Sequence, residues 1–252
     1  MVDALYAGGA ERYVSLLAES LDRHRFLPSV VARSGSGLDG WSEQLRERCV
    51  AVSRVPMNLP YRPFDVIPIA GALRRHRPHL VHVNMPGPYD GQMGLLAPIA
   101  RLAGARAVVT TEHLPMVERL WKRALVKGAA YRWADRVFTI CNDNVIYLNE
   151  IQKVPHAKIE VIYNGLPKEF GRNRGALRRV ARERLGIDDG CTAIGLVGSL
   201  IERKGVATLL EAVSGLDRSS WQVLLVGDGQ ERQRLEGRAK TLGIQDRVCF
   251  LG

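Results

Sequence analysis

The sequence predicts an α/β protein made of two doubly wound units. Short runs of aliphatic residues alternate with helical patterns along the 252 residues. Several of these runs are continuously apolar, which is typical of parallel strands buried on both faces. The alternation is interrupted once, by a polar, Arg-rich stretch over residues 166–190. We therefore expect right-handed crossovers, with helices covering both faces of each parallel sheet.

Each apolar run between turn signals is expected to form one strand. The expected strands are Ser29–Ala32, Val50–Val55, Leu80–Asn84, Ala107–Thr111, Arg136–Cys141, Ile159–Tyr163, Thr192–Val197, Gln222–Val226 and Val248–Leu251.

Helices are expected where apolar residues recur at i, i+3, i+4 and i+7. Glu11–Arg23, Val206–Leu216 and Glu231–Leu242 each carry one such stripe. A shorter helix is expected over Leu177–Leu185, closed by Gly186.

The domain boundary is placed after the turn signal Asn164-Gly165. The first unit then covers residues 1–165, a basic linker with a short helix covers 166–190, and the second unit covers 191–252. Ligands of doubly wound sheets lie beyond the carboxyl ends of the strands. We therefore expect the functional site in a cleft between the two units.

The formal net charge is +10, and residues 166–184 contribute seven basic and two acidic side chains to it. Such a balance suits nucleic acid, anionic lipid or phosphorylated substrates. No nucleic-acid motif accompanies the charge, so nucleic acid is not an expected partner. Glu118–Asp135 is basic and contains Trp121 and Trp133. This segment is interpreted either as a helix on an anionic membrane surface or as an ordinary solvated face.

The four cysteines, at positions 49, 141, 191 and 249, form no CxxC pair. They are interpreted as buried free thiols of a protein in the reducing cytoplasm. The histidines offer no HExxH spacing, so no metal site is expected.

Two loops of the first unit have residues suited to chemistry. Gly8-Gly9 precedes the first helix, where backbone amides at a helix N-terminus can bind phosphate; the alternative is a tight turn. The pair is not a GxGxxG fingerprint. His113 follows the strand Ala107–Thr111 and is suited to hydrogen bonding or proton transfer, although a lone histidine is usually structural.

Two loops of the second unit follow its first two strands. In the loop from Gly198 to Gly205, Arg203 and Lys204 stand at the start of a helix. The helix dipole disfavours cations there unless an anion lies between them, which predicts a phosphate site rather than a solvated loop. Gly227-Asp228-Gly229 is interpreted either as a glycine loop lining the site or as a turn with a capping aspartate.

Taken in order, seven short motifs of this chain resemble those of the retaining glycosyltransferases of family four, which have the two-domain, Rossmann-like GT-B fold. The motifs are Gly8-Gly9-Ala10-Glu11-Arg12, Thr111-Glu112-His113, Ala134-Asp135-Arg136-Val137, Val161-Ile162-Tyr163-Asn164-Gly165, Val197-Gly198-Ser199-Leu200 with Lys204-Gly205, Leu225-Val226-Gly227-Asp228-Gly229 and Arg247-Val248-Cys249-Phe250-Leu251-Gly252.

The resemblance implies transfer of a sugar from a nucleotide-sugar donor to an acceptor, with retained anomeric configuration. It assigns the acceptor mostly to the first unit and the donor mostly to the second. Gly8 and Gly9 match a loop that approaches the diphosphate and the sugar, and His113 matches a histidine beside the reacting centre. Lys204 matches a lysine that neutralises the leaving diphosphate. The fold normally uses such cations and helix ends, with no metal or other cofactor.

The chain departs from the family pattern in three places. Ser199 stands where the family usually has arginine, and we hypothesise that Arg203 compensates. The family's E-x7-E glutamate pair lies beyond the position of Gly252, so the chain is expected to be a truncated fragment with little or no activity. The family's central first strand is reduced to Val2–Leu5 at most.

The leading hypothesis is a glycosyltransferase of cell-envelope polysaccharide or glycolipid assembly. It would act in the cytoplasm, at the inner face of the membrane, on a sugar or lipid-linked acceptor. Gly198, Ser199, Arg203, Lys204, Gly227 and Asp228 are its expected donor-binding residues in the second unit. The alternatives are a nucleotide-sugar epimerase of the same fold and a non-enzymatic basic module that binds anionic membrane or nucleic acid.

Overall fold

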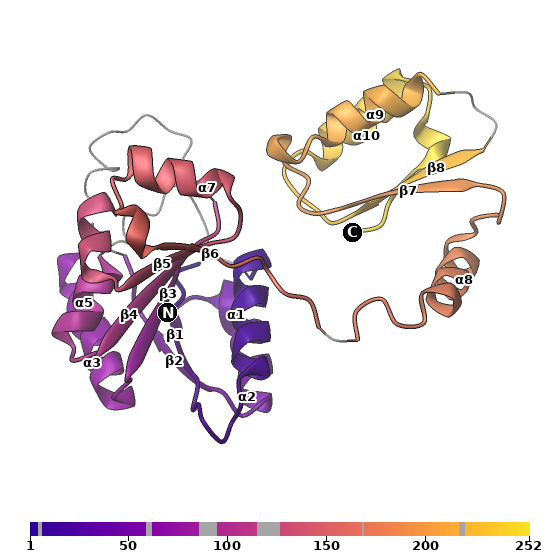
Figure 1. Cartoon of the computed structure of the whole chain (residues 1–252). Helices are drawn as coiled ribbons and strands as arrows, with labels where there is room; N and C mark the ends of the chain where they lie inside the picture. The colour runs from indigo at the N-terminus through magenta and orange to yellow at the C-terminus, as the bar shows by residue number, and fades with distance from the viewer. Residues whose placement is uncertain (5–6, 59–61, 86–94, 115–126, 168, 217–219) are drawn as a thin grey trace. The chain divides into compact units, whose positions relative to one another are not determined.

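The computed structural model describes residues 1–4, 7–58, 62–85, 95–114, 127–167, 169–216 and 220–252. The chain folds into two compact units, Met1–Lys168 and Glu169–Gly252 (Figure 1). Each unit is an α/β structure with parallel strands, as the sequence predicts.

The first unit contains one twisted parallel sheet. Its strands are β1 (Ser29–Arg33), β2 (Ala51–Val55), β3 (Leu80–Met85), β4 (Ala107–Glu112), β5 (Arg136–Thr139) and β6 (Ile159–Val161). The strands pair in the orders β1-β2 and β3-β4-β5-β6. Val2 joins these two groups, because it forms parallel bridges to both Ala32 and Asn84. The short first strand is therefore central in the sheet, as expected.

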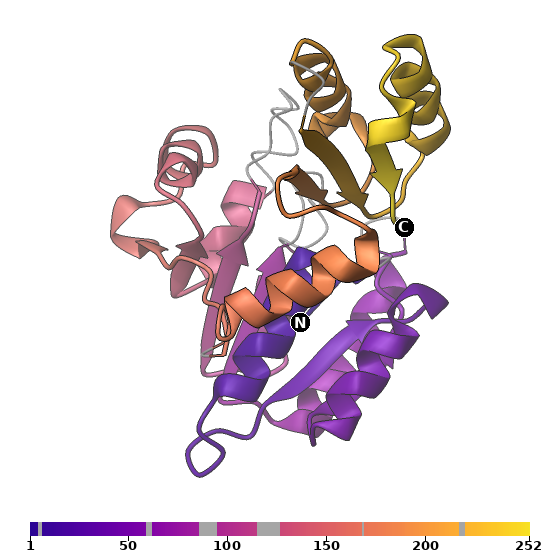
Figure 2. The same ribbon diagram turned by 90° about the vertical axis from the view of Figure 1, so that its right-hand side faces the viewer.

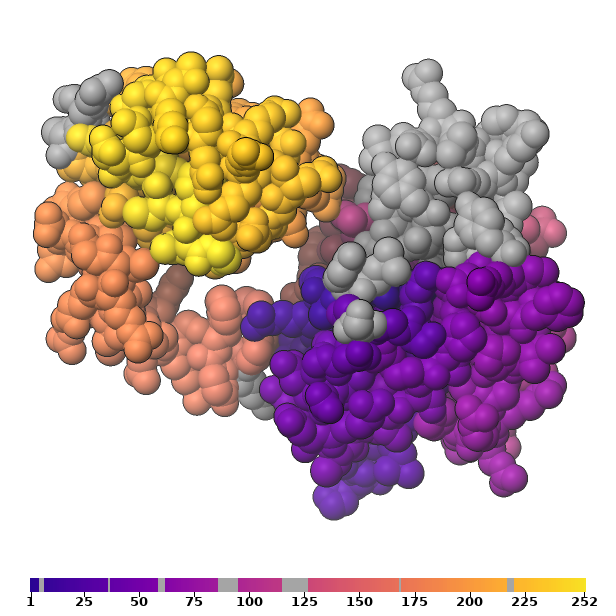
Figure 3. Space-filling model, turned by 180° about the vertical axis from the view of Figure 1, so that it is seen from behind, coloured from indigo at the N-terminus to yellow at the C-terminus, as the bar shows by residue number. Residues whose placement is uncertain are grey.

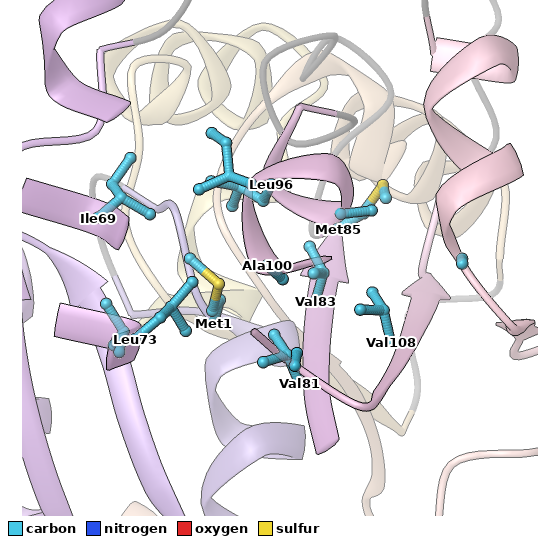
Figure 4. Close-up of a cluster of buried hydrophobic side chains, with 14 of the residues drawn as sticks. Met1, Ile69, Leu73, Val81, Val83, Met85, Leu96, Ala100 and Val108 are labelled. Carbon is cyan, nitrogen blue, oxygen red and sulfur yellow. The ribbon is translucent and has the colours of Figure 1, made fainter. Parts of the chain in front are cut away.

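Helices cover both faces of this sheet. They are α1 (Gly9–Ser20), α2 (Asp39–Glu47), α3 (Val66–His76) and α5 (Leu96–Leu102). Alternate residues of β1 belong to different cores, since Val30 and Ala32 pack with α1 and α2 while Val31 packs with α3 and α5. Figure 4 shows side chains of α3 and α5 gathered beside Val81 and Val83 of β3. Each fully buried aliphatic side chain of this kind contributes roughly 1.5–3 kcal/mol.

Shorter helical segments complete the described part of the first unit. These are the 3-10 turns Ser36–Leu38, Pro63–Asp65, Tyr131–Trp133 and His156–Lys158, the single turn α7 (Asp143–Ile146) and the π-helical segment Tyr147–Ile151. Residues 127–130 are also helical.

The order of the strands creates a switch point in the first unit. From the central first strand the chain runs outward to β1 and β2, and it then returns to build β3 to β6 on the other side. The helices that follow the first strand and β3, α1 and α5, pack on opposite faces of the sheet, and ligands of doubly wound sheets bind at the carboxyl ends of strands at such a point. The Gly8-Gly9 turn and the end of β3 both lie at this edge.

The second unit has a parallel sheet of order β7-β8-β9. Its elements are α8 (Arg174–Leu185), β7 (Thr192–Val197), α9 (Val206–Ser214), β8 (Trp221–Val226), α10 (Arg232–Thr241) and β9 (Val248–Phe250), with 3-10 turns at Glu202–Lys204 and Gln245–Arg247. Helices α9 and α10 lie on one face of the sheet and enclose a core around Val223 and Leu225 (Figures 1 and 2). On the opposite face Val197 is 79% exposed.

Helix α8 confirms the expected helix and begins three residues earlier, at Arg174. Gly186 closes it in the left-handed conformation, with φ of 63°, which glycine adopts at no steric cost. Most of its residues are exposed, and the orange atoms of this region lie at the surface in Figure 3. Arg182 is the buried exception, and its guanidinium donates to the carbonyl oxygens of Asp188 and Cys191.

Two expectations from the sequence are wrong. The cysteines are not buried core residues, because Cys49 is exposed and Cys141, Cys191 and Cys249 are half-buried. Lys127, assigned to the basic helix over Glu118–Asp135, is fully buried. Residues 118–126 of that segment lie outside the described residues. Within the described part of the chain, no helix has the length and apolar character needed to span a membrane.

Candidate functional site

The glycine turn of the first unit caps helix α1. The backbone amide of Gly8 donates to Glu11 Oε2 at 2.8 Å, and Glu11 is only 3% exposed. The Glu11 carboxylate therefore occupies the Gly8 amide, as the N3 glutamate of a capping box does. The amides of Gly9 and Ala10 have no intrahelical acceptor, so they are the donors that this helix N-terminus offers to a ligand. The predicted role of Gly9 thus gains a geometric basis, whereas the Gly8 amide already has a partner.

His113 lies one residue past β4, at the same edge of the sheet. Its backbone amide donates to the Met85 carbonyl at 3.2 Å, and its Nε2 is 3.4 Å from Asn84 Oδ1. The Tyr13 ring of α1 meets the imidazole edge to face, with centroids 5.0 Å apart. Burial lowers the pKa of His113 to about 4, so the ring is neutral at physiological pH.

A second histidine, His82, lies inside β3 and was not assigned to the site from the sequence. Its Nε2 is 2.7 Å from Thr111 Oγ1, and its ring lies near Tyr13 and Phe138. Burial lowers the pKa of His82 to about 3. The first unit therefore holds a cluster of neutral rings at the switch point of its sheet.

These two histidines make stability depend on pH. Their native pKa values lie below 6.5, the ordinary value for histidine, so the unfolded chain takes up protons first as the pH falls. Stability should therefore be complete above pH 6.5 and decrease toward pH 4, by about 2 kcal/mol per histidine between pH 7.5 and 5. Urea unfolding at both pH values checks this. His113→Asn should flatten the dependence and His24→Asn, at an exposed position, should not; equal slopes in all three proteins would contradict the expectation.

Glu112, the residue before His113, forms a buried ion pair. Lys127 Nζ is 2.6 Å from Glu112 Oε2, and both side chains are fully buried. The Tyr131 hydroxyl donates to the same oxygen at 2.5 Å, and burial raises the pKa of that hydroxyl, with a further increase from Glu112. Gly128 permits this packing, because a Cβ there would lie 2.2 Å from the carbonyl oxygen of Gln152. The cluster attaches residues 127–131 to the end of β4, just before His113.

In the second unit, the two glycine loops interlock at the carboxyl ends of β7 and β8. The Gly198 amide donates to the Val226 carbonyl and the Leu200 amide donates to the Asp228 carbonyl, both at 2.9 Å. A Cβ on Gly227 would lie 2.2 Å from the Gly198 carbonyl oxygen, and one on Gly229 would lie 2.5 Å from that of Leu200. Both positions therefore require glycine for this close contact.

The Lys204 side chain extends over this joint. Its Cε lies 3.6 Å from the position that a Cβ on Gly198 would occupy, and its Nζ lies 4.0 Å away. Gly205, with φ of 67°, turns the chain from the 3-10 segment into α9, so Lys204 stands just before the helix N-terminus. Ser199 and Arg203, which are close to Lys204 in the sequence, are both exposed. An ammonium held beside a helix N-terminus makes a site for a phosphate group.

The Asp228 side chain forms a hydrogen bond within its own loop. Its Oδ1 accepts from the Gly229 amide at 2.7 Å, and its Oδ2 lies 3.5 Å from Arg232 of α10. This geometry supports the turn interpretation of the aspartate, and Arg232 partly balances its charge. Each unit thus gathers its own predicted residues at the carboxyl edge of its sheet: Gly8, Gly9 and His113 in the first, and Gly198, Ser199, Lys204, Gly227 and Asp228 in the second.

A cavity of the second unit lies away from these glycine loops. It has a volume of about 510 Å³ and is lined by Arg178 and Arg182 of α8 and by Thr192 at the start of β7. This is the amino end of the strand, whereas ligands of doubly wound sheets bind at the carboxyl ends. We therefore do not assign it to the site. No cluster of His, Cys, Asp and Glu suited to a metal occurs among the residues that the structure describes.

Two α/β units with glycine loops at the carboxyl ends of parallel strands define the GT-B class of proteins. The fold of this chain is similar to the crystal structure of Anabaena Alr3699/HepE in complex with UDP and glucose, with a TM-score of 0.78. The two sequences are 19% identical, and the match covers all of this chain and 68% of that chain. Residues 7–170 match Glycosyltransferase Family 4, and residues 178–252 match Glycosyl transferases group 1. The chain therefore belongs to glycosyltransferase family 4.

Two curated relatives carry specific names. The 2-deoxystreptamine N-acetyl-D-glucosaminyltransferase of Streptomyces fradiae is 30% identical over 74% of this chain and 48% of its own length. The GDP-mannose-dependent alpha-(1-6)-phosphatidylinositol monomannoside mannosyltransferase of Mycolicibacterium smegmatis is 27% identical over 96% of this chain and 63% of its own. The chain thus spans about half to two thirds of the length of these relatives. The family match agrees with the resemblance that the sequence motifs indicate.

Proposed function

We propose that this protein transfers a sugar from a nucleotide-diphosphate donor to a sugar or lipid-linked acceptor, with retention of anomeric configuration. The observation that carries the proposal is Lys204, whose side chain lies over the Gly198–Gly227 joint at the start of α9. As the bond between sugar and diphosphate breaks, negative charge grows on the leaving phosphate. An ammonium beside a helix N-terminus stabilises that charge, and no metal is required for this step.

The residues of the first unit contact the transferred sugar and the phosphate nearest to it in this proposal. The amides of Gly9 and Ala10 donate to oxygen atoms of the sugar or the nearer phosphate, since Glu11 already occupies the Gly8 amide. His113, kept neutral by burial, contributes hydrogen bonds to sugar hydroxyls. A neutral ring avoids repelling the positive charge that develops on the sugar carbon.

The biological setting is proposed from the relatives. Lipopolysaccharide core biosynthesis glycosyltransferases LpsD and LpsE of Rhizobium meliloti match parts of this chain, and the mannosyltransferase above acts on a phosphatidylinositol mannoside by its name. We propose a role in cell-envelope polysaccharide or glycolipid assembly, in the cytoplasm and at an anionic membrane surface. Flotation with liposomes that contain or lack anionic lipid tests the membrane part.

Product analysis tests the proposed activity directly. The protein, produced from its whole reading frame, is incubated with a panel of UDP- and GDP-sugars and with sugar and lipid-linked acceptors, and transfer is followed by mass spectrometry. A product whose new linkage has the anomeric configuration of the donor supports the proposal. An inverted linkage, or interconversion of the nucleotide sugar itself without transfer, contradicts it.

Gly9→Ala is expected to separate binding from folding. A Cβ at Gly9 meets no atom within 4 Å, so the free energy of unfolding should change by less than about 0.5 kcal/mol. The methyl group would nevertheless stand where the ligand approaches the α1 amides, and donor affinity should fall by about tenfold or more. Calorimetric titration with the nucleotide sugar, alongside urea unfolding, measures both. Gly40→Ala, with the same free space around it, is the matched control and should leave affinity unchanged.

Ser199 stands where the family usually has an arginine, and Arg203→Ala tests whether Arg203 supplies the missing positive charge. If Arg203 contacts the diphosphate, its loss should weaken nucleoside-diphosphate binding about three- to tenfold, and more at low salt. Arg179→Ala, at an exposed position on α8, is the matched control. An affinity unchanged by Arg203→Ala would eliminate the compensation hypothesis and leave Lys204 as the main cation of the loop.

A further inference from the structure

The side chains around His113 can determine which of its ring nitrogens carries the proton. Asn84 is 3% exposed, and its Oδ1 faces His113 Nε2 at 3.4 Å. An amide oxygen only accepts hydrogen bonds, so this contact requires a hydrogen on Nε2. In a neutral ring Nδ1 is then left with its lone pair. The contact is long for a hydrogen bond, which is common at sites whose ligand is absent.

The position of Asn84 follows from the sheet and not from a flexible loop. Asn84 pairs with Thr111 in the β3–β4 register, and its neighbour Met85 accepts the backbone amide of His113. Adjacent residues of β3 thus hold the backbone and the ring of His113. Tyr13 meets the same ring from α1, with an interplanar angle of 74°. His82 is the other titratable ring in the cluster, and its Nε2 contacts Thr111.

We propose that Asn84 and Tyr13 are positioning residues for His113: Asn84 fixes the ring as the Nε2–H tautomer, and Tyr13 fixes its orientation. His113 then offers Nδ1 as a hydrogen-bond acceptor to a sugar hydroxyl and does not act as a proton donor. The part of this inference that concerns the sugar rests on the proposed function. The tautomer and its dependence on Asn84 concern the free protein alone.

Nitrogen-15 NMR of the imidazole groups in the full chain tests the inference at pH 7. The wild-type protein is expected to show protonated Nε2 and unprotonated Nδ1 at His113. Asn84→Asp replaces the amide by a carboxylate that favours the imidazolium, so the His113 pKa should rise by about 1–3 units. Asn173→Asp makes the same charge change at an exposed position of the second unit and should leave the His113 titration unchanged.

The tyrosine is tested by a conservative and a disruptive variant. Tyr13→Phe keeps the aromatic edge and should preserve the His113 ring shifts, whereas Tyr13→Leu should change them. An Nδ1–H tautomer in the wild type overturns the inference without any variant, and so does an unchanged pKa in Asn84→Asp. Failure to bind any nucleotide sugar, with the expected tautomer present, would instead contradict the proposed function and leave the positioning roles of Asn84 and Tyr13 supported.

Discussion

Glu112→Gln is expected to lower the free energy of unfolding by about 3–5 kcal/mol, because it leaves the Lys127 ammonium buried without its counter-charge. The substitution keeps the size of the side chain, so the loss reflects charge and not a cavity. Tyr131 and Lys127 share one oxygen of Glu112, and the glutamine offers them an uncharged acceptor in its place. Urea unfolding monitored by circular dichroism measures the effect.

A matched control and a double variant separate the ion pair from general fragility. Glu211→Gln makes the same chemical change at an exposed pair, where Arg238 lies 2.8 Å away, and should cost less than about 1 kcal/mol. Glu112→Leu combined with Lys127→Met removes both charges and should cost less than Glu112→Gln alone. Equal losses for Glu112→Gln and Glu211→Gln would show that burial of the pair has no energetic consequence.

Gly227→Ala is expected to lower the free energy of unfolding by about 2–4 kcal/mol and to separate the two glycine loops of the second unit. Two causes act together. The backbone at Gly227 has φ of 132°, which side chains rarely adopt, and the new Cβ would lie 2.2 Å from the Gly198 carbonyl oxygen. Relief of this overlap requires the Gly198 loop to move, and Lys204 lies over that loop. Nucleoside-diphosphate binding should therefore be lost together with stability.

Gly237→Ala is the control for this glycine. It lies in α10, where a Cβ meets no atom within 4 Å, and the change should stabilise the helix by about 0.5–1 kcal/mol. Thermal unfolding of both variants compares them directly. A Gly227→Ala protein as stable as the wild type would mean that the loops are not interlocked as described.

The fold was largely predictable because it depends on periodic patterns. Each expected strand is present within a residue or two of its predicted bounds, since buried parallel strands appear as apolar runs between turn signals. Even the shortened first strand keeps its place, through the bridges of Val2. The helices α2, α3 and α5 were not predicted individually. Val66–His76 also contains an internal proline, Pro68, which argues against a helix when only the sequence is considered.

The candidate site was predicted from local patterns, namely residues that share a loop and His113 at the end of a strand. Gly198 and Lys204, or Gly8 and Gly9, are near each other in the sequence, and their glycine and charge patterns signal a ligand. The partners of His113 come from other strands and helices, so sequence spacing does not reveal them. One signal was present: Asn84 and His113 both follow apolar runs, and the ends of parallel strands meet at one edge.

Lys127 shows why charge patterns mislead. In sequence it continues a series of basic residues with tryptophans, which favoured a solvated or membrane-facing helix. Its spacing of four residues from Tyr131 places the two on one helix face. Only the structure shows that this face is directed toward Glu112, so that the cation belongs to the core.

Calorimetric titration of this chain with UDP and GDP, in EDTA and again with Mg²⁺, tests the proposed donor site most directly. Saturable binding is expected with at least one of these nucleotides, and Lys204→Ala should weaken it by about tenfold or more. Lys240→Ala, which removes an exposed cation from α10, should bind like the wild type. Binding that is unaffected by Lys204→Ala, or that is equally strong for the nucleoside monophosphates, would contradict the assignment of Lys204 to the leaving diphosphate.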